Sequence, residues 1–130
     1  MPTAIERFHP LIREWFLGQY DRATDIQDKA WPVIAGKHHS LICAPTGSGK
    51  TMTAFLWAIH RLASGELPLN RTGILYVSPL KALNNDIRRN LITPIDQLKT
   101  VFSGHDAVFP EIRVLTRSGD TPSADRRRML

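Results

Sequence analysis

Cysteine is almost absent from this chain of 130 residues, because Cys43 is the only one. A single thiol cannot form an intrachain disulfide, and a zinc site built on cysteines would lack ligands. Long apolar runs are also missing, and residues 1–10 contain no apolar signal core. We therefore expect a soluble protein of the cytoplasm that has no membrane partner.

Charge of one sign is only in modest excess, with 17 Lys and Arg against 12 Asp and Glu and a net charge of +5. This balance favours polyanionic partners such as nucleotides or nucleic acid. The basic residues are scattered, apart from the pair Arg88-Arg89 and the run Arg126 to Arg128. We expect the run Arg126 to Arg128 to be a solvated helix face. A hydrophobic content of 42% predicts a globular domain with a core.

Two segments near the N-terminus have the periodicity of amphipathic helices. Apolar side chains recur at helical spacing between residues 8 and 20. A second helix begins after Thr24, its expected N-cap, with Gln27 at the capping-box position, and stops between Pro32 and Gly36. The three tryptophans lie in helical patterns and are expected in the core: Trp15, Trp31 and Trp57.

Further along the chain, short apolar runs alternate with helical patterns. We expect buried strands at 39–44 and 74–77, a third strand at 112–116, and helices at 49–63 and 81–91. Pro94 either kinks the second of these helices or starts another that continues through Leu98, and a loop follows at 103–110. The last helix is expected to be capped by Ser123 or Thr121. This alternation predicts an α/β fold with a parallel sheet and flanking helices.

A Gly-rich segment joins the first expected strand to the next helix: Ala44, Pro45, Thr46, Gly47, Ser48, Gly49, Lys50 and Thr51. A phosphate-binding loop needs converging backbone N–H groups, glycines that permit close approach, and a helix N-terminus. In that geometry Lys50 would reach the β- and γ-phosphates of ATP, and the Thr51 hydroxyl would coordinate Mg²⁺. These two are the candidate catalytic residues. The alternative is a Gly-Ser turn with a solvated lysine, against which the strand-loop-helix context argues.

Four segments occur in the order found in superfamily 2 helicases: 24–27, 44–51, 78–83 and 117–121. On these motifs the chain resembles the large helicase-related (Lhr) family of DEAD/DEAH-box helicases, from about Phe8 to Leu130. The resemblance implies a RecA-like P-loop NTPase fold. Residues 1–36 would then be N-terminal helices with a segment like the Q motif, and residues 37–130 a partial ATP-binding domain.

The resemblance also implies roles for individual residues. Gln27 looks like the Q-motif glutamine, whose amide can pair with an adenine edge, although it can equally be a capping glutamine and the two roles are compatible. Ser78, Pro79 and Lys81 resemble a motif that binds the sugar-phosphate backbone of one strand. Their alternative role is a strand-to-helix turn with a capping serine and a surface lysine.

The segment with Arg117, Gly119 and Asp120 resembles the Arg-Thr-Gly-Asp-Thr motif of Lhr helicases. Ser118 departs from that motif at one position but keeps a hydroxyl. The implied role lies along the nucleic-acid path, and the alternative is a Gly-Asp turn that leads into a capped helix.

An Asp-Glu pair after a further strand, which in this class holds Mg²⁺ and orients the attacking water, is not found in the sequence. We therefore expect an incomplete first motor domain, truncated before the Asp-Glu box. The resemblance implies an ATP-dependent, 3′-to-5′ translocase or helicase that acts on single-stranded or partly duplex nucleic acid in DNA repair, with DNA favoured over RNA. The rest of the motor would be its partner if encoded elsewhere.

Taken alone, the chain is expected to bind nucleotide and nucleic acid weakly, without efficient hydrolysis or unwinding. An uncovered sheet edge should also leave it marginally stable or prone to aggregation. Two alternatives stay open. One is another P-loop enzyme, such as a nucleotide kinase or transporter ATPase, and the other is a non-catalytic nucleotide or nucleic-acid binding module.

Overall fold

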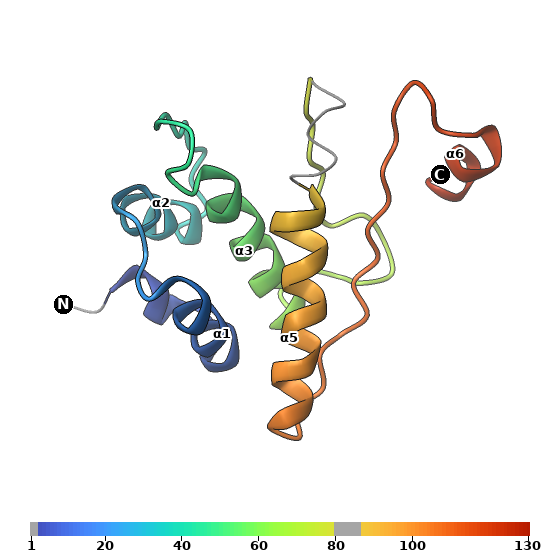
Figure 1. Ribbon diagram of the computed structural model, residues 1–130. Coiled ribbons are helices and arrows are strands. Elements are labelled where there is room, and N and C mark those ends of the chain that lie inside the picture. The colour runs from blue at the N-terminus through green and yellow to red at the C-terminus, as the bar shows by residue number, and fades with distance from the viewer. Residues whose placement is uncertain (1–2, 80–86) are drawn as a thin grey trace.

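The structure, a computed structural model, describes residues 3–79 and 87–130. Its helices are η1 (Ala4–Arg7), α1 (Pro10–Tyr20), α2 (Asp25–Ala35), α3 (Lys50–Ala63), η3 (Arg88–Ile92), α5 (Thr93–Gly104) and α6 (Ser123–Arg128). Figure 1 shows α1, α2, α3 and α5 gathered into one helical body, with α6 apart from them at the end of a long extended segment. None of the helices in the described ranges has the length and apolar character needed to cross a bilayer.

The first two long helices begin where the sequence predicts. Pro10 occupies the first turn of α1, and the His9 imidazole accepts a hydrogen bond of 3.1 Å from the Leu11 N–H. At the start of α2 the Thr24 hydroxyl accepts from the Gln27 N–H at 3.4 Å, and the Gln27 side-chain oxygen accepts from the Thr24 N–H at 2.9 Å. This reciprocal pair is the predicted capping box, which satisfies backbone donors that the helix itself leaves unpaired.

The core lies where the helices meet. Fully buried side chains come from each of the four long helices: Ile12, Trp31, Leu56 and Leu98. The Phe8 ring packs edge-on against Trp31 with a centroid distance of 4.7 Å, an arrangement that aromatic pairs prefer. Trp15 is also buried, as predicted, while Trp57 packs at the margin of the core.

The three predicted strands are the main correction. Residues 39–44, 74–77 and 112–116 are extended, but none of them is paired as a strand within the described part of the chain. Burial still alternates with the period of a strand, because Ile42 and Ala44 are half-buried while Leu41 and Cys43 are exposed. The predicted strands are therefore not found among the described residues, and the runs expected to be buried expose Leu41, Leu75 and Val77. A strand of a parallel sheet must pair with another strand from a distant part of the chain. An apolar run does not specify which segment that partner is.

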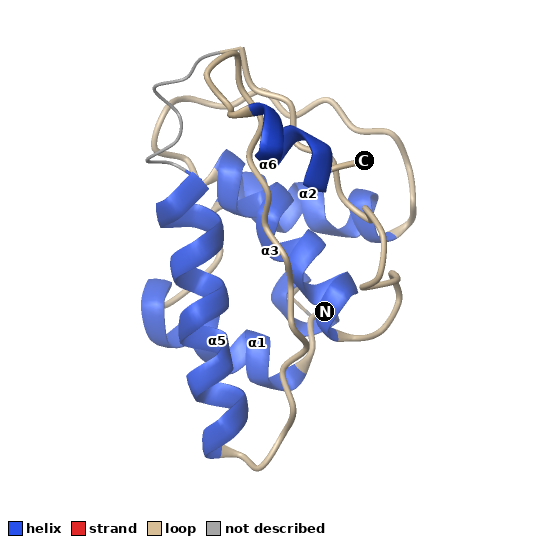
Figure 2. Ribbon diagram, turned by 90° about the vertical axis from the view of Figure 1, so that its right-hand side faces the viewer, coloured by secondary structure: helices blue, strands red, loops and turns tan. Residues whose placement is uncertain are grey.

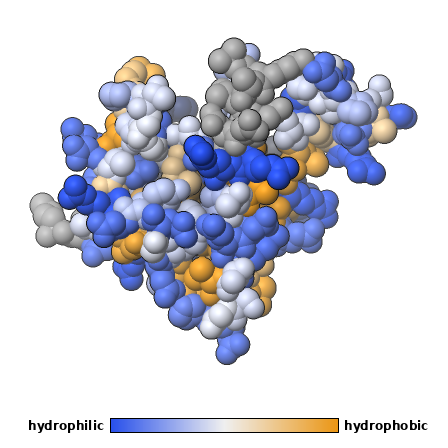
Figure 3. All heavy atoms as spheres, viewed as in Figure 1, coloured by the Kyte–Doolittle hydropathy of each residue, from blue (hydrophilic) through white to orange (hydrophobic). Residues whose placement is uncertain are grey.

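Unpaired extended segments leave apolar side chains in solvent. Leu41 is 91% exposed, Leu75 is 82% exposed and Val77 is 80% exposed. Apolar patches are visible among the polar surface in the space-filling view of Figure 3. Figure 2 shows the extended C-terminal segment crossing the helical body as a loop on its surface. Exposed apolar side chains of this kind favour association, which stays a prediction for this chain.

The helix around Pro94 runs further than predicted. Pro94 lies in the first turn of α5, directly after the π-helical η3, so the backbone stays helical through the proline. The missing proline N–H is tolerated there because first-turn donors have no partner within an α-helix. α5 continues past Leu98 to Gly104, and the loop begins at His105.

The predicted cap of the last helix is wrong. Pro122 is the N-cap of α6, and no side chain caps that helix. Ser123 is the first helical residue instead, and the Thr121 hydroxyl accepts a hydrogen bond of 2.7 Å from the Ser118 N–H. The Thr121 hydroxyl is therefore engaged in the turn before α6 and does not cap that helix.

His60 ties α3 to the segment before α1. Its Nδ1 accepts a hydrogen bond of 3.1 Å from the His9 N–H, and its ring packs edge-on against Phe8 with a centroid distance of 5.3 Å. Burial lowers the pKa of His60 below its ordinary value, Glu66 opposes that shift, and His9 and Arg61 add to it. The folded protein therefore favours the neutral imidazole, which can accept the bond from His9.

We expect the free energy of unfolding to fall as the pH drops below about 6.5, the ordinary histidine pKa. In that range the unfolded chain binds a proton at His60 that the folded chain excludes, so acid favours unfolding, and the effect disappears at higher pH. Urea unfolding followed by circular dichroism would measure this in the unmodified chain and in His60→Gln, with the exposed His39→Gln as control. An unchanged pH dependence in His60→Gln would contradict the assignment.

Candidate nucleotide and nucleic-acid site

The Gly-rich segment forms a loop between the extended residues 39–44 and the start of α3. Gly47 has φ +84° and Gly49 has φ +87°, in the left-handed region that side chains with a Cβ disfavour. Because α3 begins at Lys50, the loop ends on a helix N-terminus, where backbone donors and the helix dipole favour an anion. Figure 1 shows this loop at the upper end of α3.

Side chains within the loop fold it back on itself. The Lys50 ammonium donates to the Ala44 carbonyl at 2.5 Å and so lies across the loop. The Pro45 carbonyl accepts from the Ser48 N–H at 3.2 Å and from the Ser48 hydroxyl at 2.5 Å. Thr51 follows in the first turn of α3 and is half-buried. The residues thus fit a bound phosphate chain, whose oxygens would replace the Ala44 carbonyl as the partner of Lys50.

The start of α2 holds the loop from the other side. The Gln27 amide donates to the Gly49 carbonyl at 3.3 Å, and the Thr24 hydroxyl donates to the Ser48 carbonyl at 2.8 Å. A Cβ on Gly49 would lie 2.6 Å from the Gln27 amide nitrogen, so a larger residue there would displace the Gln27 side chain. The sequence places Gln27 at a helix cap, but the contact between the two motifs is visible only in the structure.

Two of the three candidate residues in segment 78–83 are described. Ser78 is half-buried and Pro79 is exposed at the end of the extended residues 74–77, whereas Lys81 lies outside the described residues. Their predicted contact with nucleic acid stays a prediction. In Figure 1 the turn that precedes α6 lies toward the upper end of the molecule, as the Gly-rich loop does.

Residues 117–121 form a turn with its own hydrogen bonds. The Thr121 N–H donates to the Ser118 carbonyl at 3.2 Å, and the Asp120 N–H donates to the Ser118 hydroxyl at 3.3 Å. Arg126 donates from Nη2 to the carbonyls of Ser118 at 3.1 Å and Gly119 at 2.9 Å. The prediction that Arg126 belongs to a solvated helix face is therefore wrong. The sequence does not distinguish Arg126 from Arg127 and Arg128, because the contact of Arg126 with Ser118 and Gly119 depends on how α6 folds back onto the turn.

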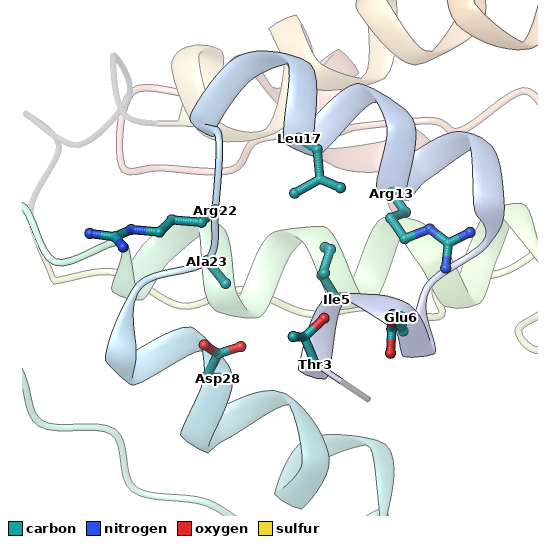
Figure 4. Close-up of a pocket in the computed structure, with 8 residues that line it drawn as sticks. All are labelled: Thr3, Ile5, Glu6, Arg13, Leu17, Arg22, Ala23 and Asp28. Carbon is teal, nitrogen blue, oxygen red and sulfur yellow. The ribbon is translucent and has the colours of Figure 1, made fainter. Parts of the chain in front are cut away.

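Two hollows lie away from these motifs. One, of about 570 Å³, lies between η1, α1 and α2, where Figure 4 shows Ile5 and Leu17 facing one another. The other, of about 990 Å³, includes Trp57 and His60. Neither is lined by a residue of the Gly-rich loop. Among residues 3–79 and 87–130, no three His, Cys, Asp or Glu side chains are grouped to hold a metal.

The loop and the helix that it opens have the arrangement of a P-loop, with Gln27 beside it. A family model for DEAD/DEAH box helicases matches residues 24–124, and the chain belongs to that family. Among its relatives, the "Lhr helicase/ probable uracil glycosylase" of Mycolicibacterium smegmatis is 49% identical over 95% of this chain. The "ATP-dependent helicase Lhr-Core protein 2" of Thermococcus barophilus is 44% identical over 92% of this chain.

A solved structure shares the fold. The structure of Mycobacterium smegmatis helicase Lhr bound to ssDNA and AMP-PNP matches 98% of this chain with a TM-score of 0.89 and 48% identity. The predicted resemblance to Lhr helicases is thus confirmed, and a RecA-like P-loop fold is supported. The chain spans 8% of the M. smegmatis relative, 14% of the T. barophilus relative and 16% of the chain in the solved structure.

Proposed function

We propose that this chain is the ATP-binding N-terminal part of an Lhr-type, ATP-dependent DNA helicase or translocase. The observation that carries the proposal is the Gly-rich loop, which opens α3 and is held by Thr24 and Gln27. The match to the helicase family over 24–124 supports the same conclusion. A kinase or transporter ATPase would share the loop but not this match.

In this proposal the loop holds the phosphates of ATP. Lys50 exchanges the Ala44 carbonyl for phosphate oxygens, and the loop N–H groups contact the same anion. Thr51, in the first turn of α3, offers its hydroxyl to Mg²⁺, which when bound neutralises phosphate charge. The AMP-PNP in the solved relative supports a triphosphate as the ligand.

Gln27 can brace the loop and contact adenine at the same time. A neutral amide has two N–H donors and an oxygen that accepts twice. One N–H donates to Gly49, and the oxygen accepts once from the Thr24 N–H. One donor and one acceptor position therefore remain, which is the pair that an adenine edge requires. Gln27 is 4% exposed, and we propose that it sets the base preference once adenine lies against its amide.

Nucleic acid is proposed to contact two further segments. Ser78, Pro79 and Lys81 would hold the sugar-phosphate backbone of one strand, together with Arg117, Gly119 and Asp120 in the turn before α6. The ssDNA in the solved relative supports DNA as the substrate. We also propose that the chain acts in the cytoplasm in DNA repair, and that the remaining segments of the helicase motor are its partner. Without an Asp-Glu pair, the chain alone is proposed to bind ligands without hydrolysis or unwinding.

The test is a titration with fluorescent ATP and GTP analogues in the presence of Mg²⁺. The unmodified chain is expected to bind the ATP analogue about tenfold more tightly, equivalent to about 1.4 kcal/mol and within the range of hydrogen bonds to the base. Gln27→Ala should lose this preference and weaken both analogues, because it also releases Gly49. Phosphate release, followed in parallel, should stay at background.

Gln19→Ala is the matched control, since Gln19 is exposed near the end of α1. It should leave both affinities unchanged. Equal affinity of the unmodified chain for the two analogues would remove the adenine role from Gln27. Steady phosphate release would show that the chain hydrolyses ATP without the acidic pair, contrary to the proposal.

A further inference from the structure

The Arg126 side chain contacts the turn of residues 117–121, which precedes its own helix α6. Its Nη2 donates to the carbonyls of Ser118 and Gly119 at 3.1 Å and 2.9 Å. Its Nε is buried and has no hydrogen-bond partner in the described part of the chain. Arg127 and Arg128 are exposed, although they belong to the same short helix. Arg126 is therefore packed against the turn rather than extended into solvent.

The two carbonyls that Arg126 engages belong to residues 117–121. Carbonyl oxygens repel phosphate, so a turn that contacts a nucleic-acid backbone must direct them away from the ligand. Bonds to Arg126 do this, and charge-assisted bonds of this kind are stronger than neutral ones. The Thr121 hydroxyl and the Ser118 hydroxyl hold the other side of the same turn.

We propose that Arg126 is a positioning residue for nucleic-acid binding. It fixes residues 117–121 in the shape that contacts the sugar-phosphate backbone, and it does not act as a surface charge. This inference rests on the proposed nucleic-acid function of that turn. It assigns different roles to neighbouring arginines of one helix, which makes it testable with charge-matched variants.

The experiment measures binding of a fluorescein-labelled oligothymidylate by anisotropy, with the unmodified chain, Arg126→Gln and Arg127→Gln. Both variants lose one positive charge from α6. Arg126→Gln is expected to weaken binding on the order of tenfold, as for loss of a charge-assisted bond, while Arg127→Gln changes it less than about threefold. Binding of the ATP analogue should be the same in all three chains.

A second readout examines the turn directly, without nucleic acid. The amide resonance of Gly119 in a ¹⁵N-labelled chain should shift in Arg126→Gln and stay in place in Arg127→Gln. α6 contributes no buried residue, so the helical body should fold in both variants. Should Arg126→Gln fail to fold, Arg126→Lys replaces it, and we expect the same direction of change.

The outcomes separate the inference from the function on which it rests. Equal weakening in the two glutamine variants would overturn it, because charge alone would then suffice. Loss of the ATP analogue in Arg126→Gln or Arg126→Lys would overturn it too, since Arg126 would then support the whole fold. If the unmodified chain binds no oligonucleotide, the nucleic-acid function of the turn is refuted. The Gly119 resonance then decides alone whether Arg126 fixes the turn.

Discussion

Replacing Trp31 by alanine is expected to lower the free energy of unfolding by about 4 kcal/mol. The Trp31 side chain is fully buried, and its ring contacts Phe8 and Phe16 at centroid distances of 4.7 Å and 5.5 Å. Its Nε1 donates to the Thr53 carbonyl at 2.9 Å and so joins α2 to α3. Since domains are stable by only about 5–15 kcal/mol, this loss removes a large part of the stability of the chain.

Urea denaturation followed by far-ultraviolet circular dichroism measures this effect. Trp57→Ala is the matched control because Trp57 is half-buried at the margin of the core, and its cost should be about half as large. Trp31→Phe keeps an aromatic ring but leaves the Thr53 carbonyl without its donor, which should cost about 1–2 kcal/mol. Equal losses for the two alanine variants would show that Trp31 is not the centre of this core.

Replacing Lys50 by alanine is expected to weaken binding of the ATP analogue by roughly 10- to 100-fold. This range corresponds to about 1.5–3 kcal/mol for a hydrogen bond to a charged group. Lys50 is half-buried, and among the described residues its ammonium bonds to the Ala44 carbonyl of the same loop, so its loss should leave the core intact. Circular dichroism and the urea midpoint should therefore match those of the unmodified chain.

Lys37→Ala controls for the change in net charge, because Lys37 is exposed in the turn after α2. It should not alter the affinity for the ATP analogue. Lys50→Arg keeps the charge but replaces a compact ammonium by a planar fork, and we expect it to recover only part of the affinity. An unchanged affinity in Lys50→Ala would refute the assignment of the phosphates to this loop.

The two predictions are connected through a short path in the structure. Trp31 and Gln27 lie one turn apart on α2, and Trp31 is anchored to Thr53 on α3. The Thr53 hydroxyl in turn donates to the Gly49 carbonyl at 2.7 Å, the same oxygen that accepts from Gln27. The core therefore sets the position of the loop relative to Gln27. Milder changes at Trp31, such as Trp31→Phe, should weaken nucleotide binding as well as stability.

Local signals in the sequence were sufficient for much of this description. The helical spacing of apolar residues predicted α1, α2 and α3 to within about two residues, because a helix satisfies its hydrogen bonds within one segment. The capping box at Thr24 and the order of glycines in the loop are equally local. Together with the motif order, these patterns were enough to identify the helicase family.

What the sequence could not determine depends on contacts between distant segments. The apolar runs at 74–77 and 112–116 predicted extended backbone, but whether they pair as strands depends on neighbours that no local pattern specifies. Gln27 meets Gly49 only because α2 and α3 pack side by side. Arg126 meets Ser118 only because α6 folds back, and this separates it from two exposed arginines beside it. In each case tertiary packing decides the partner, whereas the sequence alone determines α1, α2 and α3, the capping box of α2 and the chemistry of the loop.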